Sequence, residues 1–140
     1  MNEKFKVEVW KHFERTQNIF LATLDGSKPR VRPVTMIYYN DRFWVATGTD
    51  NAKVKQIKEN KNIEFCLTLE GDKYKGYIRG TGIAVIIKDI ETKKMIVNST
   101  PFFKEYWESA YDPSFTLLEI LIKEIEYLRP AEFKVERFSV

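Results

Sequence analysis

The sequence has a single cysteine, Cys66, and a single histidine, His12, among its 140 residues. One cysteine cannot form a disulfide within the chain, and two such residues cannot supply the four ligands of a structural zinc site. Cys66 lies in an apolar run with the pattern of a strand, so we expect a buried structural thiol. His12 lies beside Trp10 and Phe13, a setting more typical of packing or of a surface than of catalysis. We therefore predict no metal site.

Several familiar signatures of function are also missing. The chain has no G-x-S-x-G elbow, Walker A motif or G-x-G-x-x-G fingerprint. Residues 1–6 lack the apolar core of a signal peptide, and no apolar run approaches the length of a bilayer span. We therefore expect a cytoplasmic protein without a membrane partner. The net charge of +3 suits a small anionic ligand and falls short of the basic surface of a dedicated nucleic-acid binder.

What the chain does contain is typical of one ordered domain spanning residues 1–140. Hydrophobic residues make up 44% of the sequence and aromatic residues 14%. Helical spacing or capping signals predict helices over 3–15, 51–60, 89–97 and, as a short aromatic helix, 101–107. Alternation and turn signals predict strands over 18–24, 30–39, 42–47, 63–69 and 74–87.

The C-terminal part is less clear. Residues 117–128 fit either a helix or a strand to 122 followed by another over 125–128, and periodicity does not decide between them. Val135 and Phe138 are candidates for a final strand. The segment Gly80-Thr81-Gly82 suggests a bend or bulge that curls a sheet. Five or six strands with short hairpins and peripheral helices predict a mainly β fold, built as a small closed or partly closed barrel.

The most informative segment runs from Thr47 to Lys53 and combines several anion-binding features. It follows a strand and begins a helix, where unpaired N–H groups and the positive end of the helix dipole favour an anion. The hydroxyls of Thr47 and Thr49 and the ammonium of Lys53 add donors, and a phosphate is the obvious candidate. The alternative is that Thr49 or Asp50 simply caps the helix.

Proline in the preceding strand points to the same region. Pro33 lies within the predicted strand 30–39 and cannot donate a ladder hydrogen bond. Such a residue belongs on an edge, at a bulge or where the backbone faces a ligand.

The order and spacing of these pieces resemble a known family. The sequence carries, in order, Leu21-Ala22-Thr23-Leu24-Asp25-Gly26-Ser27-Lys28-Pro29, Arg30-Val31-Arg32-Pro33-Val34-Thr35, Trp44-Val45-Ala46-Thr47-Gly48-Thr49 and Asn51-Ala52-Lys53-Val54. This pattern is similar to the FMN-binding split-barrel family related to pyridoxamine 5'-phosphate oxidase, especially its short, general-stress-protein-like members. The resemblance is clear from about Phe20 to Leu69. It implies a Greek-key-like split β-barrel that forms a homodimer, with one FMN in each of two grooves at the subunit interface.

The resemblance also implies roles for particular residues. Arg32 matches the strand arginine that approaches the flavin phosphate, and Asn51 and Lys53 match a Ser/Thr and a Lys that hold it. Thr47 matches a hydroxyl residue at the end of the next strand. The full set of implied cofactor-binding residues is Arg32, Pro33, Val34, Thr35, Thr47, Gly48, Thr49, Asn51, Ala52 and Lys53, with Pro33, Val34 and Thr35 beside the isoalloxazine ring.

The chain departs from the family pattern at two places. Asn51 stands where the family has Ser or Thr, and an amide is a weaker phosphate donor than a hydroxyl. Pyridoxamine 5'-phosphate oxidase itself has a C-terminal arginine and histidine for its substrate, whereas no histidine follows His12 here. We therefore do not expect oxidation of the vitamin. Related split barrels bind a deazaflavin cofactor, which these residues also allow, or haem, which the missing histidine disfavours.

Three functions remain open at this point. The first is a flavin-dependent oxidoreductase acting on a small molecule, in which the flavin carries the chemistry and no catalytic side chain is identified. The second is a protein that stores or senses a flavin or deazaflavin without turnover. The third is a small barrel that stacks single-stranded nucleic acid on Trp44, Tyr38 and Tyr39. The mild net charge disfavours this third function, so we predict no nucleic-acid partner.

Overall fold

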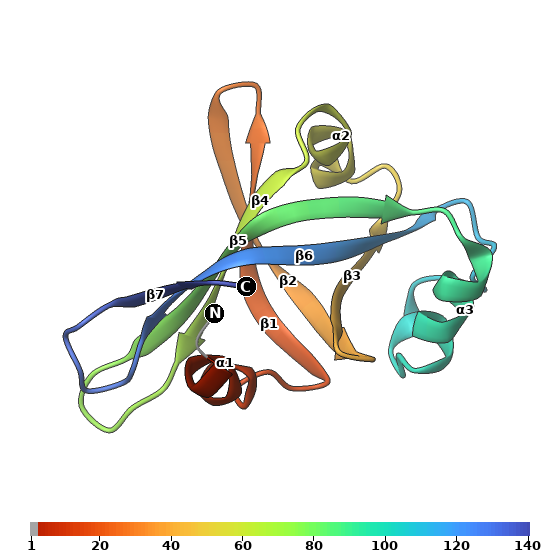
Figure 1. Ribbon diagram of the computed structural model, residues 1–140. Helices are drawn as coiled ribbons and strands as arrows, with labels where there is room; N and C mark the ends of the chain where they lie inside the picture. Colours follow the sequence, from red (N-terminus) through yellow and green to blue (C-terminus); the bar gives the residue numbers. More distant parts are fainter. Residues whose placement is uncertain (1–2) are drawn as a thin grey trace.

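The computed structural model describes residues 3–140 as a β-rich fold with helices at its periphery (Figure 1). The helices are α1 (Glu3–Trp10), α2 (Ala52–Glu59), α3 (Ile90–Asn98) and a short 3-10 helix, η1 (Phe103–Glu105). The strands are β1 (Thr16–Asp25), β2 (Lys28–Tyr39), β3 (Arg42–Gly48), β4 (Asn62–Leu69), β5 (Gly76–Ile87), β6 (Phe115–Leu128) and β7 (Glu136–Ser139). The predicted class, mainly β with peripheral helices, is confirmed. Within residues 3–140, no helix has both the length and the apolar composition needed to cross a membrane.

The antiparallel sheet closes on itself as a barrel. Its strand order is β3-β2-β1-β4-β5-β6-β7, and an additional pairing of β3 with β6 closes the ring. After α2, β4 returns to lie beside β1, so the first four strands have the order 4-1-2-3 of a Greek key. The predicted Greek-key-like barrel is therefore confirmed. β7 pairs with β6 outside the ring.

The predicted irregularity at 80–82 is found as a bulge on β6, opposite this segment of β5. The register of β5 against β6 shifts between Thr81 and Gly82, and Lys123 is the extra residue on β6. A Cβ atom on Gly82 would lie 1.9 Å from the carbonyl oxygen of Leu121, so this close approach of two strands requires glycine.

β6 is one strand of 14 residues, so the helix considered for residues 117–128 is wrong and the strand alternative is right except for its break. The helix is absent, and the break expected after 122 is instead the bulge at Lys123 within a continuous strand. Residues 115–120 are buried on both faces of the strand, so apolar side chains occur on both faces and the run does not alternate. A run of this kind cannot be distinguished from a buried helix by periodicity.

The two buried faces of β6 belong to two different cores. Leu118 and Ile120 point into the barrel and pack with the apolar residues of β1, β4 and β5. Phe115 and Leu117 point outward and pack with Trp44 and with residues of α3 and η1. Packing in this second core therefore holds the helical segment 90–107 against the outer face of β3 and β6.

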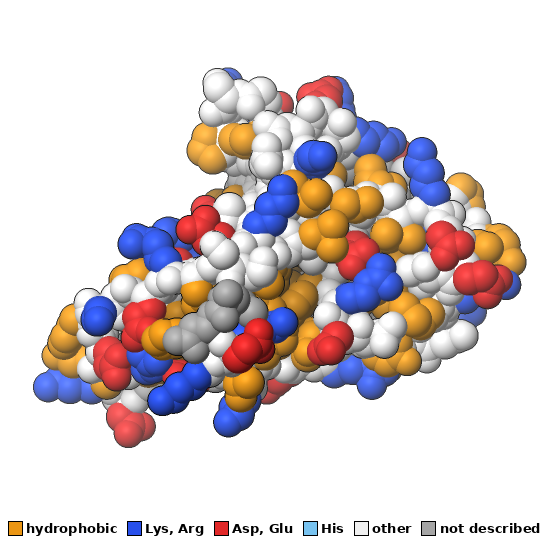
Figure 2. Space-filling model, viewed as in Figure 1, with side chains coloured by type: hydrophobic (Ala, Val, Ile, Leu, Met, Phe, Trp, Pro, Cys, Tyr) orange, Lys and Arg blue, Asp and Glu red, His pale blue; other side chains and the backbone are white. Residues whose placement is uncertain are grey.

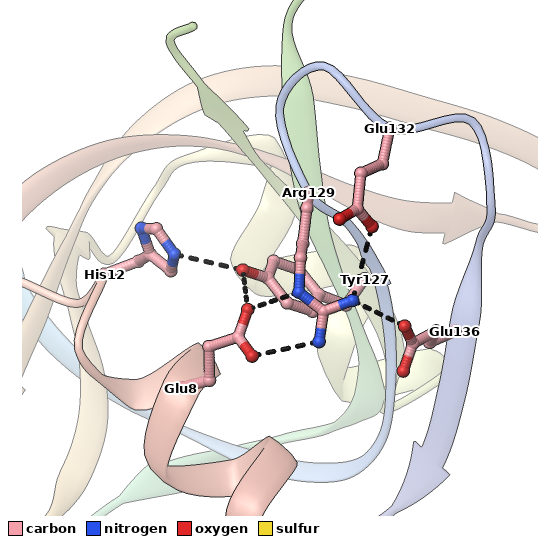
Figure 3. A network of polar contacts seen from close by, with 6 residues as sticks. All are labelled: Glu8, His12, Tyr127, Arg129, Glu132 and Glu136. Carbon is pink, nitrogen blue, oxygen red and sulfur yellow. Dashed lines mark hydrogen bonds and ion pairs between the residues drawn. The ribbon is translucent and has the colours of Figure 1, made fainter.

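A polar network holds α1 to β6 and to the segment that leads into β7 (Figure 3). Its members are Glu8, His12, Tyr127, Arg129, Glu132 and Glu136. Glu8 accepts from the Arg129 guanidinium (Nε–Oε2, 2.6 Å) and from the Tyr127 hydroxyl at 2.7 Å. These hydrogen bonds, led by that from Arg129, lower the pKa of Glu8 from 4.5 to about 2. His12 Nε2 lies 3.3 Å from the same hydroxyl, which is the predicted packing role.

Three local expectations need correction. The helix predicted over 3–15 ends at Trp10, because the amides of His12 and Phe13 bond three residues back, at 3.1 Å to Val9 O and 3.2 Å to Trp10 O. The short aromatic helix contains only the three residues of η1. Cys66 is half-buried on β4 rather than fully buried, and burial raises the pKa of its thiol.

Candidate functional site

A groove opens where β2 and β3 separate. Their pairing covers residues 37–39 against 42–44. Beyond these pairs, β3 continues along β6 and β2 continues along β1, so the two strands no longer contact each other through the ladder. Figure 1 shows them diverging from their shared turn, with α2 at the open end. The barrel is therefore split at this point, as the resemblance implies.

The groove has a volume of about 500 Å³ and three kinds of wall. One wall is the segment 33–35 of β2, and another is the segment 45–48 of β3. The third is aromatic and comes from the residues around η1, namely Phe102, Tyr106 and Trp107. Pro33 lies on the part of β2 that does not pair with β3. Its missing N–H therefore interrupts no hydrogen bond between β2 and β3.

Lys53 is the one charged side chain among the described residues that line the groove. Only 5% of Lys53 is exposed, and its Nζ donates to Thr47 Oγ1 at 2.7 Å. Burial, with a smaller effect of the nearby Arg32 charge, lowers the pKa of Lys53 from 10.5 to about 8. Within residues 3–140, no carboxylate forms an ion pair with it. A buried ammonium held only by a hydroxyl is favourable for an anionic ligand.

Arg32 is not among the residues that line the groove. Its guanidinium donates to the carbonyl of Leu21 at 3.2 Å, to Thr23 Oγ1 at 2.9 Å and to Gln56 Oε1 at 2.9 Å. The Thr23 hydroxyl also donates to Gln56 Oε1, at 2.6 Å. Burial lowers the pKa of Arg32. The structure therefore places Arg32 beside the groove, partly buried and held by Leu21, Thr23 and Gln56, where its charge is close enough to act on Lys53.

The start of α2 differs from the capping alternative. Asn51 occupies the N-cap position, and its side chain makes no capping hydrogen bond. The Thr49 hydroxyl donates to the carbonyl of Pro113 at 2.8 Å and lies 2.9 Å from Thr116 Oγ1. Neither Thr49 nor Asp50 therefore caps the helix, and Thr49 is turned away from the groove. The N–H of Val54 donates to the Asn51 carbonyl at 3.0 Å, which leaves the N–H groups of Ala52 and Lys53 without an intrahelical acceptor.

The structure thus brings together most of the residues implied for the cofactor. Those that line the groove are Pro33, Val34, Thr35, Thr47, Gly48 and Lys53. Those that do not are Arg32, Thr49, Asn51 and Ala52. The sequence reasoning did not assign Thr23, Gln56, Phe102, Tyr106 or Trp107 to the site. A signal for Gln56 was present, because it lies three residues after Lys53 and hence on the same side of α2.

Of the three aromatic residues considered as a stacking platform, Trp44 is buried and Tyr38 and Tyr39 are half-buried. Trp44 has no exposed surface and packs in the second core, with Phe115 and Leu117. Tyr38 is half-buried and packs against the barrel core. On the face drawn in Figure 2, cationic and anionic side chains are interspersed rather than gathered into one basic region.

The split Greek-key barrel and its groove agree with the family comparison. The family model described as pyridoxamine 5'-phosphate oxidase matches residues 7–129, and the chain belongs to this family. General stress protein 26 of Bacillus subtilis (strain 168) is 25% identical over 113 residues, which cover 80% of this chain and 79% of that protein.

Solved structures agree with this assignment of the fold. A nimC/nimA family protein from Clostridium acetobutylicum is 25% identical, with a TM-score of 0.74, and the match covers 98% of this chain and 91% of that one. A protein related to general stress protein 26 from the same organism is 20% identical with a TM-score of 0.79, covering 100% and 97% of the two chains.

Proposed function

We propose that this protein binds FMN in the groove between β2 and β3 and acts as a flavin-dependent oxidoreductase on a small molecule. The observation that carries the proposal is the buried ammonium of Lys53, which lines the groove beside Thr47. Arg32 adds a second positive charge close to Lys53. Membership of the pyridoxamine 5'-phosphate oxidase family supports a flavin as the ligand.

The polar groups of the site suit a phosphate monoester. The Thr47 hydroxyl accepts from Lys53, which leaves its own hydrogen to donate to an anion. Arg32 makes three hydrogen bonds inside the protein, and a guanidinium has five N–H donors. A phosphate monoester carries between one and two negative charges at neutral pH, which matches the two cations. The start of α2 adds the positive end of a helix dipole.

The remaining walls suit the isoalloxazine ring. The stretch 33–35 of β2 offers backbone groups that are not used by β3. Across the groove, Phe102, Tyr106 and Trp107 provide flat apolar surfaces on which an aromatic ring can pack. We therefore assign the ring to the segment 33–35 and the phosphate to Lys53 and Thr47.

The flavin, when bound, supplies the redox chemistry, and the chain binds and orients it. No side chain of the groove is assigned as a catalytic acid or base. His12 is the only histidine and lies in the network that holds α1, so we do not propose pyridoxamine 5'-phosphate as the substrate.

We further propose that the protein is a homodimer that uses the outer face of β1 and β2. Phe20 is 48% exposed and Val31 is 68% exposed. In the ladder Phe20 pairs with Pro33 and Ala22 pairs with Val31, so these four side chains form one apolar surface. The surface is continuous with the β2 wall of the groove through Pro33, and exposed apolar surfaces of this kind mark protein interfaces.

Comparing FMN with riboflavin tests the phosphate site, because the two flavins differ by that group alone. In calorimetric titrations we expect FMN to bind at least about tenfold more tightly, since hydrogen bonds to charged groups contribute roughly 1.5–3 kcal/mol each. Lys53→Ala should remove this difference, whereas Lys58→Ala, at an exposed position of the same helix, should leave it unchanged. Equal affinities of the wild type for the two flavins would show that no phosphate site exists here.

A further inference from the structure

Arg32 is partnered differently from most other arginines of the described residues. Arg42 forms two hydrogen bonds of 2.7 Å with the carboxylate of Glu119, which neutralise its charge. Arg129 is paired with Glu8 in the same manner. Arg32, by contrast, forms no ion pair with any carboxylate of residues 3–140 and contacts a hydroxyl, an amide and a backbone carbonyl. Its charge therefore remains uncompensated inside the protein.

The hydrogen bonds among Arg32, Thr23 and Gln56 form a closed ring, in which the donor and the acceptor of each bond are fixed by chemistry. A guanidinium only donates, so the Gln56 atom that faces it must be the amide oxygen. The Thr23 hydroxyl accepts from Arg32 and must then donate to the same amide oxygen. The ring fixes the guanidinium between β1 and α2. Within the described residues, Nε2 of Gln56 makes no hydrogen bond, so only the oxygen of this amide is used in the ring.

A carboxylate would serve the same ring equally well in geometry and would bind Arg32 more strongly. It would also cancel one of the two positive charges next to the groove. We propose that Gln56 is a positioning residue that fixes Arg32 without neutralising it, and that this neutral acceptor gives the groove its selectivity for a phosphorylated ligand. The inference rests on the proposed flavin phosphate site and concerns what sets the charge of that site.

Gln56→Glu is the decisive variant, because it replaces the amide by a carboxylate that can still accept from Arg32 and Thr23. We expect its affinity for FMN to fall about tenfold to hundredfold, while its affinity for riboflavin changes by less than about twofold. The free protein should unfold at the same or a higher urea concentration, since the new carboxylate pairs with Arg32. Gln17→Glu is the matched control: it adds the same charge six residues from Thr23 along β1, roughly 20 Å away, and should change neither affinity.

A third variant separates charge from structure. Gln56→Met keeps the length of the side chain and removes the acceptor, so Arg32 and Thr23 each lose a partner. We expect the free protein to unfold at lower urea concentration and FMN affinity to fall clearly less than in Gln56→Glu. If the two variants weaken FMN binding equally, or if Gln56→Glu weakens riboflavin binding as much as FMN binding, Gln56 has a structural role alone and the inference is overturned.

The same experiment distinguishes the inference from the proposed function. Lys53→Ala is titrated with FMN in parallel with the Gln56 variants. If Lys53→Ala leaves FMN affinity unchanged, the phosphate does not lie at this end of the groove and the proposed site is wrong. If Lys53→Ala weakens FMN binding and Gln56→Glu does not, the site stands and only the role of Gln56 is refuted.

Discussion

Raising the pH above 8 should weaken FMN binding and stabilise the free protein at the same time, because both effects originate in Lys53. The ammonium is buried beside Thr47, and burial lowers its pKa from 10.5 to about 8. In the unfolded chain the same group keeps its ordinary pKa. Between these two pH values the unfolded chain holds the proton more tightly than the folded protein does.

The size of the effect on stability follows from the difference between the two pKa values. At 1.36 kcal/mol per pKa unit, burying the charged form of Lys53 costs about 3 kcal/mol. Below pH 8 this penalty is present in full. As the pH rises from about 8 to 10.5, the folded protein loses the proton first, so the free energy of unfolding increases with pH.

The effect on FMN has the opposite sign. A phosphate held by the Lys53 ammonium requires the protonated form, so above pH 8 the dissociation constant of FMN should rise by up to about tenfold per pH unit. Riboflavin has no phosphate and its affinity should stay nearly constant over the same range. Any change in the flavin ring itself affects both ligands, so the ratio of the two affinities isolates the phosphate.

Two measurements check this prediction. Fluorescence titrations with FMN and riboflavin, from about pH 7 to about pH 9.5, give the ratio of affinities, and urea unfolding of the free protein gives its stability. Lys53→Met should be more stable than the wild type at pH 7 by up to about 3 kcal/mol and should bind FMN weakly at every pH. Lys58→Met, an exposed control on α2, should match the wild type. If the unfolding free energies of wild type and Lys53→Met stay parallel from pH 8 to 10.5, Lys53 does not titrate as argued.

Two further predictions concern assembly and acid stability. Light scattering of the wild type at micromolar concentration should give twice the chain mass of 16.6 kDa. Phe20→Glu places a charge on the proposed interface and should give the mass of the monomer. A monomeric wild type would refute the dimer. Glu8→Gln should lower the unfolding free energy at neutral pH by about 1 kcal/mol, a small value because the Glu8 side chain is 37% exposed to screening solvent. The pKa of Glu8 is about 2 in the folded protein and 4.5 in the unfolded chain, so this stabilisation is present above pH 4.5 and is lost as the pH falls towards 2. Urea unfolding across that range should show the unfolding free energies of wild type and Glu8→Gln converging as the pH falls. A constant difference between the two proteins would contradict the role assigned to Glu8.

The part of the site that is local in sequence was predictable. Thr47 and Lys53 lie six residues apart across a strand–helix junction, and the physical chemistry of helix starts points to an anion there. The hydrogen bond between these two side chains confirms that they meet. Pro33 was likewise predictable as an edge residue, because proline cannot donate to a ladder.

The part that depends on tertiary packing was not predictable. Arg32 resembled a direct ligand, and only the packing of α2 against β1 shows that Gln56 and Thr23 hold its guanidinium. The aromatic wall comes from Phe102 to Trp107, more than 50 residues further along the chain than Thr47. No local pattern connects it with the groove. The apolar run of β6 resembled a helix because both of its faces are covered.

The closure of the barrel by β3 and β6 has a consequence for the order of events during synthesis. Trp44 pairs with Glu119, so the strand that carries Thr47 meets its partner only after 75 further residues have been made. Contacts this distant in sequence form late, since the chain must first lose the entropy of a long loop. The β3 wall and the aromatic wall of the groove are thus both completed by the last third of the chain. If the groove is the FMN site proposed above, we expect a flavin to bind after these walls have formed rather than to guide the folding of the N-terminal half.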